Sequence, residues 1–143
     1  MIGMILTGHG NFASGLNSAI TLITGKQENF EVVDFVQEHS VEDLSNNLLK
    51  AIDNLKECSD ILVFTDLVGG SPFKTAVEVS MKTESKLTVL GGTNLGMLIE
   101  CAMARGFMDN PDDLVNIALN TGKDQVIKYE FKKREEDKVE DGI

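Results

Sequence analysis

The sequence is short of the residues that mark several classes of protein. Among its 143 residues are two cysteines, two prolines and no tryptophan. Cys58 and Cys101 lie far apart and form neither a metal-ligand pair nor a disulfide framework, so we interpret both as packed thiols and expect no metal site. No proline-rich linker divides the chain. With 42% hydrophobic residues, the chain has enough apolar side chains for one folded domain.

Positive charge is also scarce. Thirteen Lys and Arg against 23 Asp and Glu give a formal net charge of −10. This field repels phosphate backbones and anionic lipid, so we expect no nucleic-acid partner. Residues 1–25 carry no charged side chain, but polar and glycine residues interrupt their apolar run and no basic segment precedes it. The pattern therefore excludes a signal peptide and a membrane span, and we expect a cytoplasmic protein.

Short apolar runs alternate with helical patterns along the chain. The runs predict strands at residues 2–7, 31–36, 61–65 and 87–90, each followed by apolar residues at helical spacing. Ser40 and Ser71 are predicted helix N-caps, with Pro72 as the first helical residue of its segment. A further helix is predicted over residues 111–120. The order predicts an α/β fold: an open, mainly parallel sheet with helices on both faces, in flavodoxin-like strand order.

The C-terminal part of the chain follows a different pattern. Ile127, Tyr129 and Phe131 alternate with charged residues, which predicts an antiparallel edge strand over Gln125–Phe131. Residues 132–143 carry charges of both signs and few apolar side chains, so we expect a frayed tail. The predicted domain therefore covers residues 1–131.

Three glycine-bearing loops follow predicted strands and should share the carboxyl edge of the sheet. They are Gly8-His9-Gly10-Asn11, Leu67-Val68-Gly69-Gly70-Ser71-Pro72 and Gly91-Gly92-Thr93-Asn94. Sites in such sheets form where the strand order reverses, commonly between the first and third strands. His9 and Asp66 are therefore expected to be neighbours.

These residues predict phosphoryl capture on a histidine. A carboxylate from Asp66 would fix the tautomer of His9 and leave its other ring nitrogen free to attack. Backbone N–H groups of Gly69, Gly70 and Ser71 at a helix start, with the Ser71 hydroxyl, would hold the phosphoryl oxygens. No Lys or Arg lies in the three loops, unlike the usual nucleoside triphosphate site. Such a neutral site favours transfer of the group over its storage.

Three parts of the chain form a specific combination of motifs: Gly8-His9-Gly10, Thr65-Asp66-Leu67-Val68-Gly69-Gly70-Ser71-Pro72-Phe73, and Gly92-Thr93-Asn94 with Met97-Leu98. With this combination the chain resembles enzyme IIA of the mannose-type sugar phosphotransferase system. The resemblance runs over about residues 1–131. It implies a cytoplasmic phosphocarrier without a cofactor, which takes a phosphoryl group from phospho-HPr onto His9. It also implies that Asp66 orients His9, that Ser71 contacts the phosphoryl group, and that the group passes to a histidine of enzyme IIB.

The resemblance also implies an assembly. Enzyme IIB is expected on a separate chain, and through it the protein would associate peripherally with the membrane subunits IIC and IID. Leu67, Val68 and Phe12 are expected to dock HPr and enzyme IIB. The family forms homodimers that exchange the last strand, here Gln125–Phe131. Gly8 stands where some relatives have Thr, so a supporting hydroxyl is lacking at that position.

Two other functions remain open on the residues alone. One is a hydrolase with Ser71 as nucleophile, His9 as base and Asp66 as orienting group, although no Gly-x-Ser-x-Gly motif is present. The other is a nucleotide or flavin binder that uses the glycine loops. His39 is expected to be a solvent-facing loop residue without a catalytic role. Methionines at positions 97, 103 and 108 are expected to pack in or beside the fourth helix.

Overall fold

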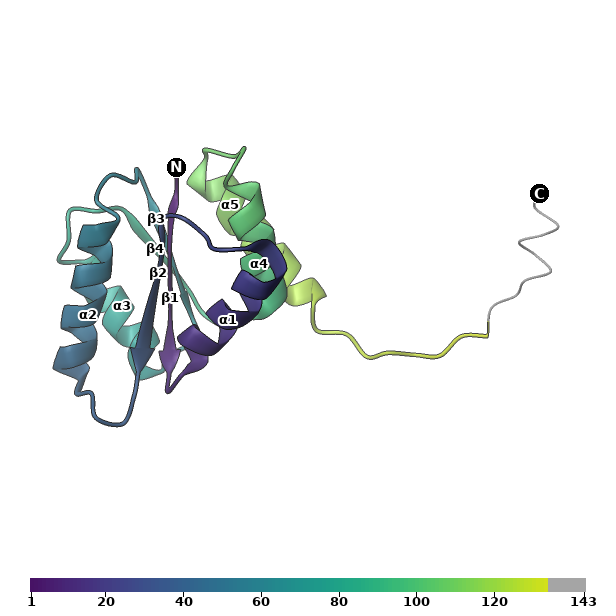
Figure 1. The fold of residues 1–143 in the computed structure, drawn as a ribbon, viewed down its shortest axis with the longest axis horizontal. Helices are drawn as coiled ribbons and strands as arrows, with labels where there is room; N and C mark the ends of the chain where they lie inside the picture. The colour runs from purple at the N-terminus through teal and green to yellow at the C-terminus, as the bar shows by residue number, and fades with distance from the viewer. Residues whose placement is uncertain (134–143) are drawn as a thin grey trace.

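The computed structural model describes residues 1–133 and shows a sheet between two layers of helices (Figure 1). The four-stranded sheet has the order β2-β1-β3-β4 and all neighbouring strands are parallel, which confirms the predicted α/β class and flavodoxin-like order. The strands are β1 (Gly3–His9), β2 (Phe30–Phe35), β3 (Ile61–Thr65) and β4 (Leu87–Leu90). The helices are α1 (Phe12–Thr24), α2 (Val41–Asn54), α3 (Ser71–Ser80), α4 (Leu95–Ala104) and α5 (Pro111–Asp124).

Two hydrophobic clusters hold the helices against the sheet. Successive side chains of a strand point to opposite faces, so Met4 and Leu6 of β1 join the cluster beneath α1, α4 and α5. Ile5, between them, joins the cluster beneath α2 and α3. The burial of each large apolar side chain stabilises the fold by about 1.5–3 kcal/mol. The two central strands are thus fixed from both faces, and their carboxyl ends are held as a rigid base for the loops.

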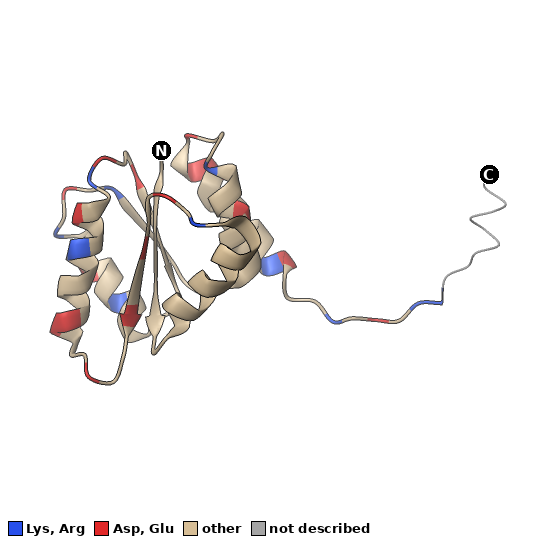
Figure 2. Ribbon diagram, viewed as in Figure 1, with Lys and Arg blue, Asp and Glu red and all other residues tan. Residues whose placement is uncertain are grey.

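Helices α1 and α2, which cover opposite faces of the sheet, differ in charge. The α1 sequence contains no Asp, Glu, Lys or Arg, whereas α2 carries residues of both signs. Figure 2 shows α1 in plain tan and, on the other side of the sheet, α2 with red and blue positions. A capping box begins α2: Ser40 Oγ accepts from the Asp43 N–H at 3.1 Å, and Asp43 accepts from the Ser40 N–H at 2.9 Å. The predicted cap at Ser40 is therefore confirmed.

The first strand is longer than predicted. It continues past Thr7 to His9. The N–H of Gly10 donates to the carbonyl of Phe35 at 2.7 Å, which keeps this end of the strand beside β2. His9 consequently belongs to the strand itself, and its backbone is more firmly held than that of a loop residue.

The start of α3 differs from the prediction by one residue. Gly70 is the N-cap, with extended backbone angles, and its carbonyl accepts from the N–H of Lys74 at 2.9 Å. Ser71 is therefore the first helical residue, and Pro72 is the second. A proline in the first turn is tolerated because the N–H that it lacks would have no partner within the helix.

The chain after α5 also departs from the prediction. The helix runs to Asp124, beyond its predicted end at Asn120, and the predicted edge strand Gln125–Phe131 is not formed in the single chain. Residues 126–131 lead away from the sheet (Figure 1), so no neighbouring strand pairs with their backbone. Of the predicted charged tail, residues 134–143 lie outside the described residues. No helix within residues 1–133 has the length and apolar character needed to span a membrane.

Candidate functional site

His9 stands at the carboxyl edge of the sheet. Its own N–H donates to Oδ2 of Asp66 at 2.9 Å. The next residue, Gly10, has a φ of +57°, in the left-handed region that glycine adopts without strain. The chain therefore turns directly from β1 toward α1. This turn leaves the His9 side chain 47% exposed, so a partner molecule can reach it.

Asp66 binds the imidazole as predicted. Its Oδ2 lies 2.7 Å from Nδ1 of His9, which confirms that the two side chains are neighbours. A carboxylate only accepts hydrogen bonds, so the neutral ring carries its proton on Nδ1 and leaves the lone pair of Nε2 free. Burial alone raises the pKa of the Asp66 carboxyl. The hydrogen bonds from His9 and from the N–H of Leu67 outweigh burial and lower that pKa below its ordinary value of 3.8, which keeps the carboxylate charged.

Gly70 lies against the free edge of the same ring. A methyl group at position 70 would stand 2.8 Å from Cε1 of His9 and 3.5 Å from its Nε2. The Gly70 N–H donates to the carbonyl of Leu67 at 3.0 Å, so this donor is engaged within the chain, and the phosphoryl-binding role of Gly70 stays a prediction. The absence of a side chain at Gly70 leaves open space beside the ring of His9.

The start of α3 supplies donors without partners. Within residues 1–133, no hydrogen bond occupies the N–H groups of Gly69 and Ser71 or the Ser71 hydroxyl. The positive end of the helix adds to their attraction for an anion. No hydrogen bond joins Ser71 to His9 within the same residues, so the nucleophile–base pair that a hydrolase requires is not formed there. These donors suit the binding of an anion beside His9.

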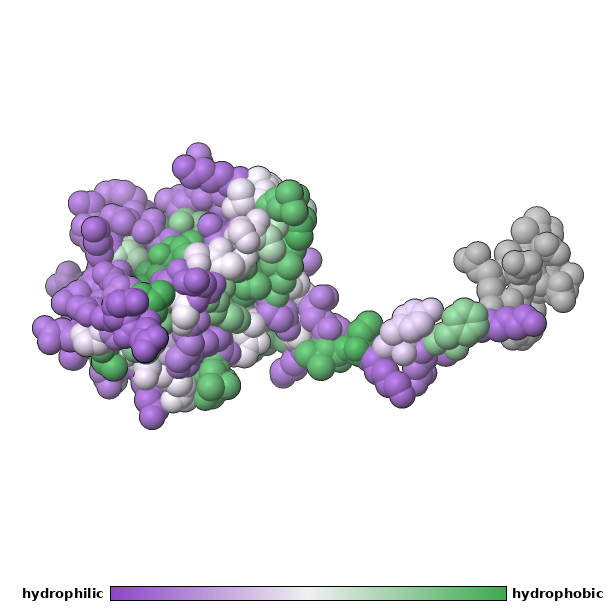
Figure 3. Space-filling model, turned by 60° about the horizontal axis from the view of Figure 1, so that its bottom comes forward, coloured by the Kyte–Doolittle hydropathy of each residue, from purple (hydrophilic) through white to green (hydrophobic). Residues whose placement is uncertain are grey.

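An apolar rim borders the site. The side chains of Leu67 and Val68 are 63% and 68% exposed, which agrees with their predicted place on the surface. Figure 3 turns this side of the molecule forward and shows hydrophobic residues between hydrophilic flanks. Phe12 is different, because it is half-buried and packs against the core. Its ring covers Gly8, where a methyl group would stand 2.5 Å from the ring.

The third glycine loop is tied to the end of β3. The N–H of Gly92 donates to the carbonyl of Asp66 at 2.8 Å, and the N–H of Thr93 donates to the carbonyl of Thr65 at 3.1 Å. The buried hydroxyl of Thr65 donates to the carbonyl of Leu90 at 2.7 Å. These bonds were not predicted from the sequence, although a threonine that ends an apolar strand is a signal for them. They fix Asp66 in place from the side opposite His9.

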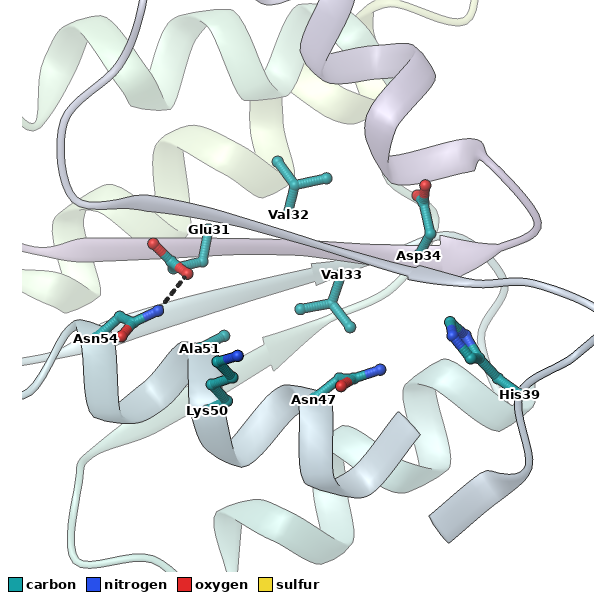
Figure 4. Close-up of a pocket in the computed structure, with 9 residues that line it drawn as sticks. All are labelled: Glu31, Val32, Val33, Asp34, His39, Asn47, Lys50, Ala51 and Asn54. Carbon is teal, nitrogen blue, oxygen red and sulfur yellow. Dashed lines mark hydrogen bonds between the residues drawn. The ribbon is translucent and has the colours of Figure 1, made fainter. Parts of the chain in front are cut away.

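A separate cavity of about 240 Å³ lies between β2 and α2 (Figure 4). Asn54 donates to Glu31 across it at 3.0 Å. Asp34 points toward α1, where it accepts from the N–H of Ser14 at 2.9 Å. The lining residues are Glu31, Val32, Val33, Asp34, His39, Asn47, Lys50, Ala51 and Asn54. None of the predicted site residues is among them.

His39 lines this cavity and is half-buried, so the expectation of a solvent-facing side chain is wrong. Its Nδ1 accepts from the N–H of Val36 at 3.3 Å. The neutral ring of His39 therefore carries its proton on Nε2, the opposite tautomer to that of His9. Within residues 1–133, no three His, Cys, Asp or Glu side chains gather in a way that could hold a metal ion.

The sulfur-containing residues pack largely as expected. Met97 is buried and Met108 packs beside it, but Met103 is 61% exposed, so the expectation is wrong for that residue. Both cysteines are free thiols, Cys101 buried and Cys58 half-buried, which confirms the prediction of packed thiols. Burial raises the pKa of Cys101 to about 12, so this side chain stays protonated and unreactive.

Comparison with known proteins identifies the family. A family model described as "PTS system fructose IIA component" matches residues 3–119. The chain belongs to the mannose-type enzyme IIA family. This enzyme IIA chain is 32% identical over 125 residues to the mannose-specific EIIAB component of Escherichia coli strain K12, and the match covers 87% of this chain and 38% of that protein. It thus spans well under half the length of that relative.

Other enzyme IIA proteins match more evenly in length. The sorbose-specific EIIA component of Lacticaseibacillus casei is 31% identical over 100 residues, which cover 70% of this chain and 71% of that protein. The crystal structure of a phosphotransferase-system EIIA from Streptococcus agalactiae is 33% identical, with a TM-score of 0.82 over 90% of this chain and 97% of that one. The mannose/sorbose IIA subunit from Enterococcus faecalis, at 24% identity and a TM-score of 0.83, covers 92% of this chain and 97% of that one and shares the fold.

Proposed function

We propose that the chain is the phosphohistidine carrier of a sugar phosphotransferase system. It accepts a phosphoryl group from phospho-HPr on His9 and passes it to a histidine of enzyme IIB on a separate chain, for coupled sugar uptake and phosphorylation. The observation that carries the proposal is the 2.7 Å contact between Nδ1 of His9 and Oδ2 of Asp66, beside the start of α3. Membership in the enzyme IIA family supports it. No cofactor takes part in the proposed reaction.

In this mechanism Nε2 of His9 is the nucleophile. A bond forms between Nε2 and phosphorus as the N–P bond of phospho-HPr breaks, and the imidazole of HPr leaves with the electron pair of that bond. The proton on Nδ1 of His9 stays in place, bound to Asp66. The carboxylate stabilises the positive charge that the ring gains when Nε2 forms its new bond. Transfer to enzyme IIB is the same step with His9 as the leaving group.

Neutral donors hold the phosphoryl oxygens. The N–H groups of Gly69 and Ser71 and the Ser71 hydroxyl fulfil this role, together with the positive end of α3. No Lys or Arg lies in the three glycine loops. A site without a cation binds the group less tightly, which favours a carrier that has to release it again.

Labelling with phosphoenolpyruvate, enzyme I and HPr tests the proposal. Wild-type protein should gain one acid-labile phosphoryl group per chain, and His9→Ala should gain none, because it lacks Nε2. His39→Ala removes the other histidine of the chain and serves as the matched control, which should be labelled normally. Label retained by His9→Ala, or absent from the wild type, would refute the proposal.

We also propose that Leu67, Val68 and Phe12 contribute to the docking surface for HPr and enzyme IIB. Their support is the exposed apolar rim beside His9, because the centres of protein interfaces are depleted in charge. Replacement of Leu67 and Val68 by Ser should raise the KM for phospho-HPr. Leu22→Ser, at an 86% exposed position near the other end of α1, is the control. An unchanged KM in the double variant would contradict the docking role.

A homodimer completes the proposal, and through enzyme IIB the carrier associates with the membrane subunits IIC and IID. Ile127, Tyr129 and Phe131 are 82%, 81% and 79% exposed, and an extended segment of this kind can pair with a second copy along the free edge of β4. Sedimentation should give a dimer for the wild type. Replacement of Ile127 and Phe131 by Glu should give a monomer. A monomeric wild type would overturn the dimer.

A further inference from the structure

Three groups surround the imidazole of His9. Asp66 binds Nδ1 and Gly70 faces Cε1, while the ring of Phe35 has its centroid 6.1 Å from that of the imidazole at an interplanar angle of 59°. This separation and tilt are typical of an edge-to-face contact between aromatic rings. We infer that Phe35 is a positioning residue for His9. It keeps Nδ1 directed at Asp66 and Nε2 directed at the start of α3.

Phe35 is itself firmly placed. It is the register partner of His9 in the parallel pairing of β1 with β2, so the two side chains leave the sheet on the same face. Its carbonyl accepts from the N–H of Gly10 at 2.7 Å, which ties the turn after His9 to β2. Its ring packs against the hydrophobic cluster beneath α2 and α3. The aromatic wall beside the imidazole is therefore anchored in the core.

A wall of this kind matters because the imidazole is 47% exposed. A half-exposed side chain has several staggered rotamers available, and one hydrogen bond in contact with water does not remove the others. Phe35 blocks the rotamers that would carry the ring toward β2 and away from Asp66. Displacement of a reacting group by about 1 Å lowers a rate by up to roughly a hundredfold. The rate of transfer should therefore depend on Phe35.

The chain offers a matched control at the other end of β2. Phe30 and Phe35 are the first and last residues of this strand, both are half-buried, and each packs against one of the hydrophobic clusters. Phe30→Leu and Phe35→Leu remove the same atoms, but only position 35 lies beside His9. Phe35→Tyr keeps the aromatic ring and should rescue the function.

Two measurements on the whole chain test the inference, which rests on the proposed function only for its kinetic part. The first is nitrogen-15 NMR of the histidine rings, with His39 as an internal reference of the opposite tautomer. In Phe35→Leu the Nε2–H tautomer of His9 should gain population, while Phe30→Leu and Phe35→Tyr should match the wild type. The second is transfer from phospho-HPr, where Phe35→Leu should lower kcat roughly tenfold and leave KM unchanged.

The possible outcomes separate this inference from the proposed function. Equal His9 spectra in Phe30→Leu and Phe35→Leu would overturn it. A raised KM with an unchanged kcat would make Phe35 a contact of HPr instead. A change in the ring nitrogen signals of His39 as large as the change in those of His9 would indicate that the end of β2 has moved, and this result would also overturn the inference. If the wild type accepts no phosphoryl group, the proposed function fails, and the NMR comparison still decides the role of Phe35.

Discussion

The two ends of the sheet are built in opposite ways. At the amino end, Arg105 is 3% exposed as a residue. Its guanidinium donates to the carbonyls of Ile2, Glu28 and Asn29, at 3.0 Å to Ile2 and 2.8 Å to Asn29. At the carboxyl end, the His9 side chain is 47% exposed and donors at the start of α3 have no partner within residues 1–133. One end satisfies its polar groups internally, and the other leaves them available.

This difference separates stability from function along one sheet. Arg105 ties the C-terminal end of α4 to Ile2, just before β1, and to the loop before β2 with several hydrogen bonds, and burial lowers the pKa of its guanidinium. No carboxylate pairs with Arg105 within residues 1–133, so backbone carbonyls and the side-chain Oε1 of Gln27, 3.5 Å from Nη2, compensate its buried charge. We therefore expect the unpartnered donors and the glycines at the other end to matter more for function than for stability.

The largest effect should come from the amino end. Arg105→Met leaves several buried carbonyls unpaired and should lower the free energy of unfolding by about 3 kcal/mol. Denaturation in urea measures this, and phosphorylation of the molecules that remain folded should be unchanged. Arg105→Lys should recover little of the loss, because an ammonium does not reproduce the planar fork of donors.

The matched control for this substitution is Lys26→Met, at an exposed position in the loop after α1. Exposed substitutions away from such contacts usually change stability by less than about 0.5 kcal/mol. Equal stabilities of Arg105→Met and Lys26→Met would show that the amino end does not carry the stability assigned to it. A loss of labelling in folded Arg105→Met would show that the two ends are coupled.

Most of the fold could be predicted from the sequence, because its signals are local. The capping box at Ser40 and Asp43 and the periodic apolar residues give α2 directly. The predicted edge strand Gln125–Phe131 is not present in the single chain, since pairing of a strand depends on a neighbour that local alternation does not reveal. The N-cap of α3 is Gly70 and not the predicted Ser71. The conformation of the turn before the helix decides which carbonyl accepts the first helical hydrogen bond, and residue type alone does not reveal it.

The site could be predicted only in part. The contact of His9 with Asp66 follows from strand order, because parallel strands end at one edge. Phe35 could not be found in this way, since its role depends on the register of β2 against β1 and on the direction of its ring. The engaged N–H of Gly70 likewise depends on the turn geometry. Residue type predicts which chemistry is possible, and register decides which neighbours take part.

The second prediction concerns the carboxyl end. Gly70→Ala places a methyl group 2.8 Å from Cε1 of His9, so the ring has to move, and transfer from phospho-HPr should fall roughly tenfold. Stability should change little, because the angles of Gly70 are those of ordinary extended backbone. Gly15→Ala is the control: it lies in α1 with open space around it, and it should stabilise the fold by about 0.5–1 kcal/mol without a change in transfer. Equal transfer rates in the two variants would mean that the ring tolerates displacement.

The smallest expected effect is a change of stability with pH. It can be measured for a carboxylate at the site, Asp66, and for one in a helix cap, Asp43. Hydrogen bonds lower the pKa of Asp43, chiefly that from the Ser40 N–H, and the pKa of Asp66 is lowered despite its burial by the bonds from His9 and Leu67. A lowered folded-state pKa stabilises the protein above the ordinary value of 3.8, and this contribution is lost as the pH falls through the folded-state value. Asp66→Asn should therefore lower the free energy of unfolding by about 0.5 kcal/mol near pH 5, and its difference from the wild type should shrink in more acidic buffer.

Asp43→Asn should follow the same trend in urea titrations, but only Asp66→Asn should slow phosphoryl transfer. If Asp43→Asn slows transfer as much, the loss reflects general loosening of the fold, and the contact with His9 has no special part in the reaction.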